Sequence, residues 1–228
     1  MATIAFIPVR CGSKSIPFKN IKDFCGKPLI YWNLKALQDC TKVDKIYVAT
    51  DCSEIEQVAK SFGFSKVEVY RRQVENATDT ASTESVMLEF LEWKAVQFQE
   101  EDIFILVQAT SPFTSTRDFT EALQLFQKDA LDSLLTCVRT KRFFWNKEGT
   151  PINYDYRSRP RRQDFPGMLM ENGAFYVSTI QAIMVSKNRL SGKIGIYEMS
   201  EDTAIELDEE SDWLIAEQIM KANRSYSI

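Results

Sequence analysis

The sequence of 228 residues contains no histidine. This absence excludes a Ser-His-Asp or Cys-His nucleophile, a histidine-ligated zinc site and an imidazole general base. Any chemistry must therefore use carboxylates, lysine, arginine, polar side chains, backbone amides or a hard metal ion. The sequence also lacks a paired cysteine motif: its five cysteines are scattered, and no two form a C-x-x-C pair. They indicate reduced thiols of an intracellular protein rather than a disulfide framework or a zinc site.

The sequence also lacks a long hydrophobic run and an excess of basic charge. No apolar stretch approaches the ~18 residues that a membrane span needs. Met1 leads into a strand-like run without the basic region and cleavage site of a signal peptide, so we expect a cytoplasmic protein with no membrane partner. Since 28 basic residues stand against 32 acidic ones, the formal net charge of −4 argues against nucleic acid as a partner.

Short apolar runs alternate with amphipathic segments along the chain. The pattern predicts strands over 3–9, 45–50, 67–70, 103–107, 133–138, 174–177 and 194–199. Helices are predicted to begin near 28, 53, 82, 118 and 209, with another between the last two strands, and capping boxes are predicted over 53–56 and 118–121. This alternation predicts an α/β fold in a single domain over 1–228, with a mostly parallel, Rossmann-like sheet and helices on both faces.

Ligands of such sheets bind where the loops gather, at the carboxyl ends of the strands. The loop after the first predicted strand combines one glycine, hydroxyl groups, an arginine and two lysines within 10–20. A turn of small residues exposes backbone N–H groups and the cations neutralise phosphate charge, so the loop predicts a polyphosphate site. It is neither a Walker A motif nor a dinucleotide fingerprint, and an isolated Gly-Ser-Lys triplet would favour a solvated basic loop.

The alternation breaks between 139 and 167, where basic and aromatic residues mix. We interpret this segment as an insertion that extends from the sheet. Aromatic residues such as Phe143 and Trp145 are costly to expose, so the segment also indicates oligomerisation.

Six blocks, in order along the chain, resemble the acylneuraminate cytidylyltransferases. The blocks are 8–30, Thr50 with Asp51, Arg72 with 79–82, 108–112, 159–164 and 171–176. The resemblance implies a nucleotidyltransferase that couples CTP to a 2-keto-sugar acid, N-acetylneuraminate or its deaminated analogue, and releases pyrophosphate. It also implies Mg²⁺ or Mn²⁺ as cofactor and a homodimer, with a dimerisation extension at about 139–170 that completes the neighbour's sugar pocket.

The resemblance assigns roles to the first loop and to residues beyond it. Catalysis is assigned to Arg10, Lys19 and Asp208, where Arg10 and Lys19 stabilise transition-state charge. CTP binding is assigned to Arg10, Gly12, Ser13, Lys14, Asn20, Lys27, Arg72 and Ser82. Arg71 remains a rival to Arg72, because the arginine is followed by Gln73 rather than by the family's usual proline.

The sugar acid and the metal are assigned to later blocks. Sugar binding is assigned to Gln108, Thr110, Ser111, Arg162 and Gln163, with Arg162 on the carboxylate. Glu206 and Asp208 replace an Asp-x-Asp pair as metal ligands and lie on one side of an extended segment. The extra methylene of Glu206 suggests contact through water, and Asp208 has an alternative role as a helix N-cap.

Three alternatives stay open from the sequence. The substrate could be another keto-sugar acid such as legionaminate, pseudaminate or octulosonate. The protein could bind nucleotide without catalysis, or the basic run 157–162 could bind RNA, although its aromatics lack the spacing of a stacking platform.

Overall fold

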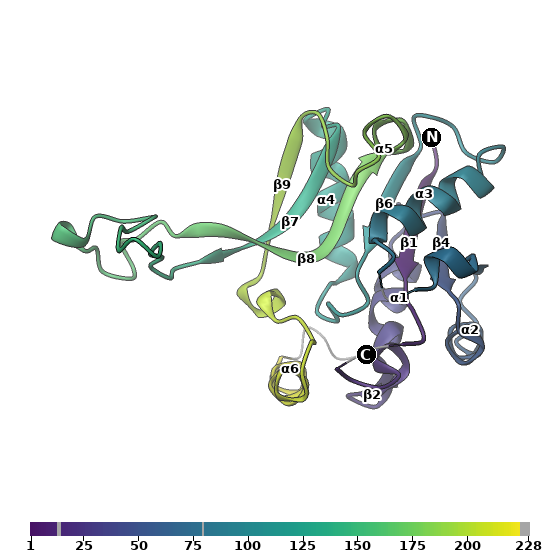
Figure 1. Cartoon of the computed structure of the whole chain (residues 1–228), viewed down its shortest axis with the longest axis horizontal. Coiled ribbons are helices and arrows are strands. Elements are labelled where there is room, and N and C mark those ends of the chain that lie inside the picture. The colour runs from purple at the N-terminus through teal and green to yellow at the C-terminus, as the bar shows by residue number, and fades with distance from the viewer. Residues whose placement is uncertain (13–14, 79, 224–228) are drawn as a thin grey trace.

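The computed structural model describes residues 1–12, 15–78 and 80–223. Seven strands form one sheet in the order β5-β4-β1-β6-β8-β7-β9 (Figure 1). Their bounds are β1 Thr3–Pro8, β4 Lys45–Thr50, β5 Val67–Arg71, β6 Ile103–Val107, β7 Ser133–Thr140, β8 Met168–Thr179 and β9 Ile194–Met199. Only β8 runs against the other strands of this sheet, so the predicted, mostly parallel α/β sheet is confirmed.

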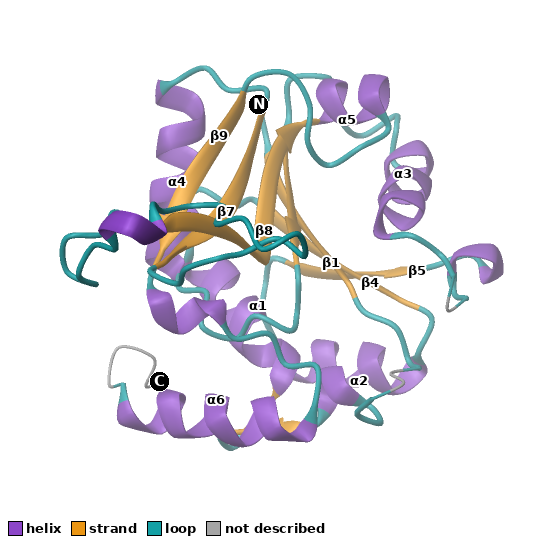
Figure 2. Cartoon of the chain, turned by 60° about the vertical axis from the view of Figure 1, so that its left-hand side comes forward, coloured by secondary structure: helices purple, strands orange, loops and turns teal. Residues whose placement is uncertain are grey.

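Helices cover both faces of the sheet (Figure 2). They are α1 Leu29–Asp39, α2 Ser53–Ser61, α3 Thr83–Trp93, α4 Thr116–Lys128, α5 Ile180–Ser186 and α6 Glu210–Ala222. Because strand side chains alternate between faces, Ile7 packs with α1, α2 and α4, whereas Phe6 packs with α3 and α5. Among the described helices, none has both the length and the hydropathy that a membrane span requires.

The last helix packs apart from both faces, on a small hairpin of β2 (Asp23–Phe24) and β3 (Lys27–Pro28). Trp213 of α6 lies edge-on to Phe24, with ring centroids 5.5 Å apart. This contact holds the segment before α6 beside the loop that follows β1.

Both predicted capping boxes are wrong. Cys52, not Ser53, is the N-cap of α2, because the Thr50 hydroxyl accepts the Cys52 N–H and the Cys52 carbonyl already accepts the Glu56 N–H. In α4 the box is formed by Ser115 and Asp118, and the helix begins at Thr116. Gly63 adopts a left-handed conformation with φ of 67° just after α2 ends.

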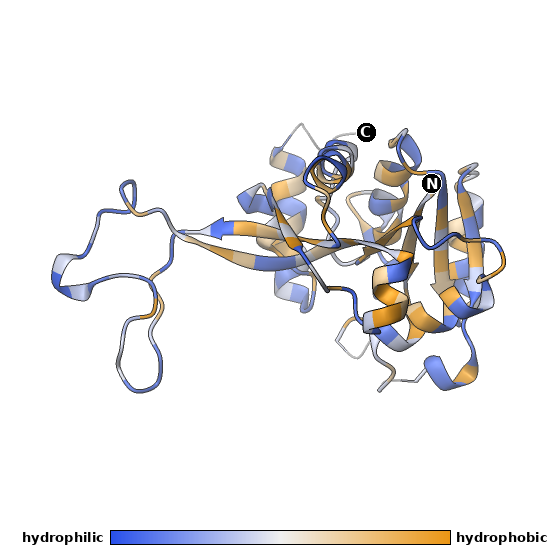
Figure 3. Cartoon of the chain, turned by 90° about the horizontal axis from the view of Figure 1, so that it is seen from above, coloured by the Kyte–Doolittle hydropathy of each residue, from blue (hydrophilic) through white to orange (hydrophobic). Residues whose placement is uncertain are grey.

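Strands β7 and β8 continue beyond the sheet as a two-stranded ribbon that ends in an arm, residues 141–167. Figures 1 and 3 show the arm standing clear of the rest of the chain. Inside it, the Phe143 ring packs on Tyr154 and Phe165, with centroids 4.2 and 4.9 Å apart. Trp145 and Tyr156 remain about half exposed. The insertion predicted between 139 and 167 therefore coincides with the ribbon and this arm.

A half-buried ion pair between α3 and the loop after α5 should make stability depend on pH. The Arg189 guanidinium donates to Glu84 at 2.5 Å, and this bond holds the pKa of the Glu84 carboxyl below its usual range. The stabilisation is present above the unfolded pKa of about 4.3 and is lost as pH falls through the folded pKa. We expect Glu84→Gln to lower the free energy of unfolding at pH 7 by about 1–2 kcal/mol.

Urea denaturation at several pH values checks this expectation. The difference between wild type and Glu84→Gln should shrink as pH falls below 4 or so. The matched control is Asp39→Asn, which removes the exposed pair with Lys35 and should change stability by less than about 0.5 kcal/mol. A Glu84→Gln difference that is constant with pH would contradict the assignment.

Candidate active site

A cavity of about 480 Å³ opens at the edge of the sheet where β1, β4, β5 and β6 end. Parallel strands place their carboxyl ends at one edge, so loops distant in sequence meet there. Nine residues predicted for the site line this cavity: Arg10, Gly12, Lys19, Asn20, Arg72, Ser82, Gln108, Thr110 and Asp208. The two remaining positions of the first loop, Ser13 and Lys14, lie outside the described residues.

The charged groups that line the cavity in the described residues are three cations and one carboxylate: Arg10, Lys19, Arg72 and Asp208. Burial lowers the pKa of the Arg72 guanidinium, and the positive charge of Arg10 lowers it further. Asp51 and Glu89 act in the opposite direction. A cavity that gathers guanidinium groups in this way is suited to an anion, because an anion between them relieves their mutual repulsion.

Lys19 joins the first loop to the segment before α6. Its side chain is only 11% exposed, and its ammonium donates to the Leu207 carbonyl at 2.6 Å and to Asp208 Oδ1 at 3.2 Å. Phe18 precedes it in a left-handed conformation with φ of 50°, and its carbonyl accepts the Ile21 N–H. This short 3-10 turn, η1 (Lys19–Ile21), directs the lysine inward.

The structure separates Arg71 from Arg72. The Arg72 side chain lines the cavity, and its Nε donates to the Ala49 carbonyl at 3.0 Å. Arg71 instead reaches Glu56 on α2, 3.0 Å from the carboxylate, with its side chain 65% exposed. Because neighbours on a strand point to opposite faces, only one of the two can enter the cavity.

Polar side chains from three elements form the rest of the wall. Ser82 is the N-cap of α3 and accepts the Ser85 N–H at 3.0 Å, which places it where a helix N-terminus meets the cavity. Gln108 and Thr110 follow β6. Ser111 is buried beside them and does not line the cavity, and its hydroxyl has no partner among the described residues.

Two further carboxylates, Glu206 close to Asp208 and Glu171 close to Glu206, do not line the cavity. Burial raises the pKa of Glu206, and the charges of Asp208 and Glu171 raise it further, whereas Lys19 lowers it. Gly173 has a φ of +63°, a backbone conformation that favours glycine. A Cβ at this position would also lie only 3.3 Å from Glu206 Oε1. Oxygen donors whose charges repel each other suit a hard divalent cation, and the group therefore fits the predicted magnesium site.

Asp208 is not the N-cap of α6. Glu209 is the N-cap of α6, in a capping box with Asp212. The alternative role of Asp208 as N-cap is therefore wrong, and its carboxylate faces Lys19 instead.

Three predicted residues lie away from the cavity. Lys27 is on the small hairpin, with its ammonium 5.1 Å from the Tyr31 ring centroid. Arg162 and Gln163 are exposed on the arm, where an Arg162 nitrogen lies 3.8 Å from Glu201. A single chain therefore does not bring the predicted carboxylate-binding arginine to the cations.

Sequence reasoning missed the residues that hold the walls in place. The buried amide of Asn33 on α1 donates to carbonyls of Gln108, Ala109 and Ser111 at 3.3–3.5 Å. An asparagine on the apolar face of a predicted helix was the available signal. Glu89 on α3 accepts hydrogen bonds from Tyr70, from the Gln73 N–H and from Asn76, and so fixes the turn after Arg72. Further cavity-lining residues that were not predicted are Pro8, Ser15, Thr78, Ala81, Thr83, Val86 and Ala109.

The fold and this site define an α/β protein with a cavity suited to an anionic ligand at the carboxyl edge of a mostly parallel sheet. A family model described as cytidylyltransferase matches residues 4–212, and the chain belongs to this family. The resemblance found in the sequence is therefore confirmed.

The chain is also similar to two curated relatives and to one solved structure. It is 40% identical to N-acylneuraminate cytidylyltransferase B of Danio rerio over 94% of this chain and 50% of the relative. It is 26% identical to the N-acylneuraminate cytidylyltransferase of Streptococcus agalactiae serotype III over 94% of this chain and 52% of the relative. The chain thus spans about half the length of these relatives.

The solved structure is a CMP:2-keto-3-deoxy-manno-octonic acid synthetase complexed with CTP. It superposes with a TM-score of 0.72 at 20% identity, covering 97% of this chain and 99% of that chain. The two share the nucleotidyltransferase fold.

The ammonium of Lys19 should stabilise the fold as well as the site. Lys19→Met keeps the apolar stem but leaves the Leu207 carbonyl without this donor, so we expect the free energy of unfolding to fall by about 1–3 kcal/mol. Urea denaturation measures the change. Lys35→Met, which removes an exposed pair with Asp39, is the control and should cost less than about 0.5 kcal/mol. Equal effects of the two variants would show that the buried ammonium does not join the loop to α6.

Proposed function

We propose that the chain couples CTP to a nonulosonic acid, N-acetylneuraminate or its deaminated analogue, and releases pyrophosphate. One observation supports this most directly: Arg10, Lys19 and Arg72 converge on one polar cavity within the family-matched segment. The curated relatives named N-acylneuraminate cytidylyltransferase support this choice of sugar acid.

The reaction needs charge neutralisation and orientation rather than a covalent protein intermediate. The anomeric hydroxyl attacks the α-phosphorus, and pyrophosphate leaves in line. In the proposal, Arg10 binds phosphate oxygens through its planar fork, and Lys19 stabilises the developing charge as a compact cation. An ammonium has three donors and the described hydrogen bonds of Lys19 use two, so one remains for a phosphate oxygen.

The cytidine half would lie toward α3. Arg72 and Ser82 line this side, and Asn20 donates to the Arg10 carbonyl at 3.4 Å, which sets the position of that loop. Apart from the chain neighbours of Gly12, no heavy atom of the described residues lies within 4 Å of where a Cβ would be, which leaves room for a phosphate beside it. Lys27 and the positions 13 and 14 remain predictions for the same ligand.

Mg²⁺ or Mn²⁺ would neutralise charge on the triphosphate when bound. Asp208 and Glu206 are the residues that would hold it. Within the chain, the Lys19 bond to Asp208 positions that carboxylate before any ligand arrives.

The sugar side of the proposal requires a second copy of the chain. Gln108 and Thr110 line the cavity, whereas Arg162 and Gln163 lie on the arm. In the proposal, two chains form a homodimer through their arms, and the Arg162 of each chain reaches the sugar carboxylate in the cavity of the other. Met168, Leu169 and Met170 on the ribbon are each more than a third exposed, and a dimer would bury them.

A pyrophosphate-release assay with CTP, Mg²⁺ and a panel of sugar acids tests the proposed reaction. The panel contains N-acetylneuraminate, its deaminated analogue, legionaminate, pseudaminate and octulosonate. We expect turnover with a nonulosonic acid, and turnover with no member would refute the proposal.

Arg10→Ala should separate catalysis from folding. Loss of a strong electrostatic donor should lower turnover by at least ~100-fold while thermal stability is unchanged. Arg71→Ala is the matched control, because Arg71 lies outside the cavity and should keep near-normal turnover. Near-normal turnover of Arg10→Ala would show that its role is misassigned.

The arm should make the protein a dimer in solution. We expect gel filtration at micromolar concentration to show a particle of twice the chain mass, and Leu169→Asp to shift it toward the monomer by placing a charge in the apolar contact. Val96→Asp, at a side chain 98% exposed after α3, is the control and should not change the elution. A wild-type particle of one chain mass would contradict the dimer.

A further inference from the structure

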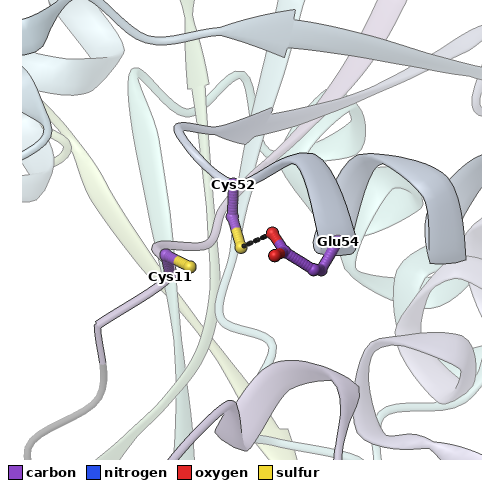
Figure 4. Close-up of side chains that lie close together, drawn as sticks. All are labelled: Cys11, Cys52 and Glu54. Carbon is purple, nitrogen blue, oxygen red and sulfur yellow. Dashed lines mark hydrogen bonds between the residues drawn. The ribbon is translucent and has the colours of Figure 1, made fainter.

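Two thiols and a carboxylate converge beside the loop after β1 (Figure 4). The ligand atoms of Cys11, Cys52 and Glu54 lie within 4.8 Å of one another, and this is the one group of three such ligands found in the described part of the chain. Neither thiol lines the cavity. Cys11 and Cys52 are far apart in the sequence and only the pairing of β1 with β4 brings them together, so no spacing motif marks them.

The backbone holds both cysteines in place. The Cys11 N–H donates to Asp51 Oδ1 at 3.1 Å, which ties the loop after β1 to the loop after β4. Cys52 is the N-cap of α2, and its N–H donates to the Thr50 hydroxyl at 3.1 Å. The site is therefore anchored by the ends of two adjacent strands and the start of a helix.

The side chains already contact each other. The Cys52 thiol donates to Glu54 Oε2 at 3.2 Å, and the Ser53 hydroxyl donates to the same oxygen at 3.0 Å. Cys52 is buried, Cys11 is half-buried and Glu54 is exposed, so the group opens to solvent on the side of the carboxylate. This gradient provides an entry path for an ion.

A metal ion needs ligands that can give up their protons, and thiols and carboxylates both can. The exposed Glu54 carboxylate is open to an ion from solvent. A thiophilic cation supplies the positive charge that stabilises both thiolates, and the two thiol protons pass to solvent.

We propose that Cys11, Cys52 and Glu54 form a site for a thiophilic divalent cation of the Zn²⁺ class. Two sulfur ligands and one carboxylate oxygen match the ligands that zinc takes, with a water completing a tetrahedral set. Occupancy would join the loop that contains Arg10 and Gly12 to the start of α2. The proposal differs from the sequence-based interpretation of the cysteines as reduced thiols rather than a zinc site, and it does not depend on the proposed function.

Titration with Co²⁺, which reports thiolate ligation by its absorption, tests the site directly. The full chain is kept reduced with a phosphine, and Zn²⁺ is then added to displace Co²⁺. We expect one equivalent to bind per chain, with a sulfur-to-cobalt charge-transfer band that Zn²⁺ abolishes. Cys52→Ser and Glu54→Gln should each weaken Zn²⁺ binding by at least about tenfold, because each removes a ligand.

Cys25→Ser is the matched control, because Cys25 is a partly buried thiol near α6 that donates to the Glu217 carbonyl. It should bind the metal like wild type. Glu54→Gln changes an exposed side chain and keeps the test valid if Cys52→Ser does not fold. The proposal is overturned if Co²⁺ gives no charge-transfer band, or if Glu54→Gln binds Zn²⁺ as tightly as wild type does.

Discussion

The repulsion among positive side chains at one edge of the sheet is the constraint on which the site depends. Arg10 and Arg72 are close enough for one to lower the pKa of the other, and Lys19 lies in the same cavity. Acidic groups close to the cations offset this repulsion; for example, Asp208 accepts a hydrogen bond from the Lys19 ammonium. The positive charge is thus held in place before a ligand binds, and an anion that enters meets donors that need no rearrangement.

The topology explains why these groups meet and why the arm does not join them within one chain. Parallel strands bring the ends of β1, β4, β5 and β6 to one edge. The single antiparallel strand, β8, pairs with β7 beyond the sheet and so directs the arm outward. The same arrangement that brings the proposed nucleotide-binding residues together therefore leaves Arg162 and Gln163 away from the cavity.

The loops after β1 and β4 connect the cavity with the proposed thiol site. Asp51 accepts the Cys11 N–H and also acts on Arg72 across the cavity edge. Cys52, one residue later, is the N-cap of α2 and faces Cys11. A cation held by the thiols would act on the backbone of the loop that presents Arg10, so the two sites share one structural support.

Local pattern was enough to determine the strands of the main sheet and its helices, and it predicted the first loop as an anion site, because periodicity and small basic loops are short-range signals. Strands 45–50, 103–107 and 194–199 were predicted with the bounds that the structure shows. The helix starts were less predictable: capping depends on which backbone N–H groups already have partners, as at Cys52 and Ser115. Only the tertiary structure decided that Arg72 rather than Arg71 enters the cavity, that Asn33 and Glu89 hold its walls, and that Cys11 meets Cys52. Each of these depends on strand register and on contacts between residues distant in sequence, which no local pattern records.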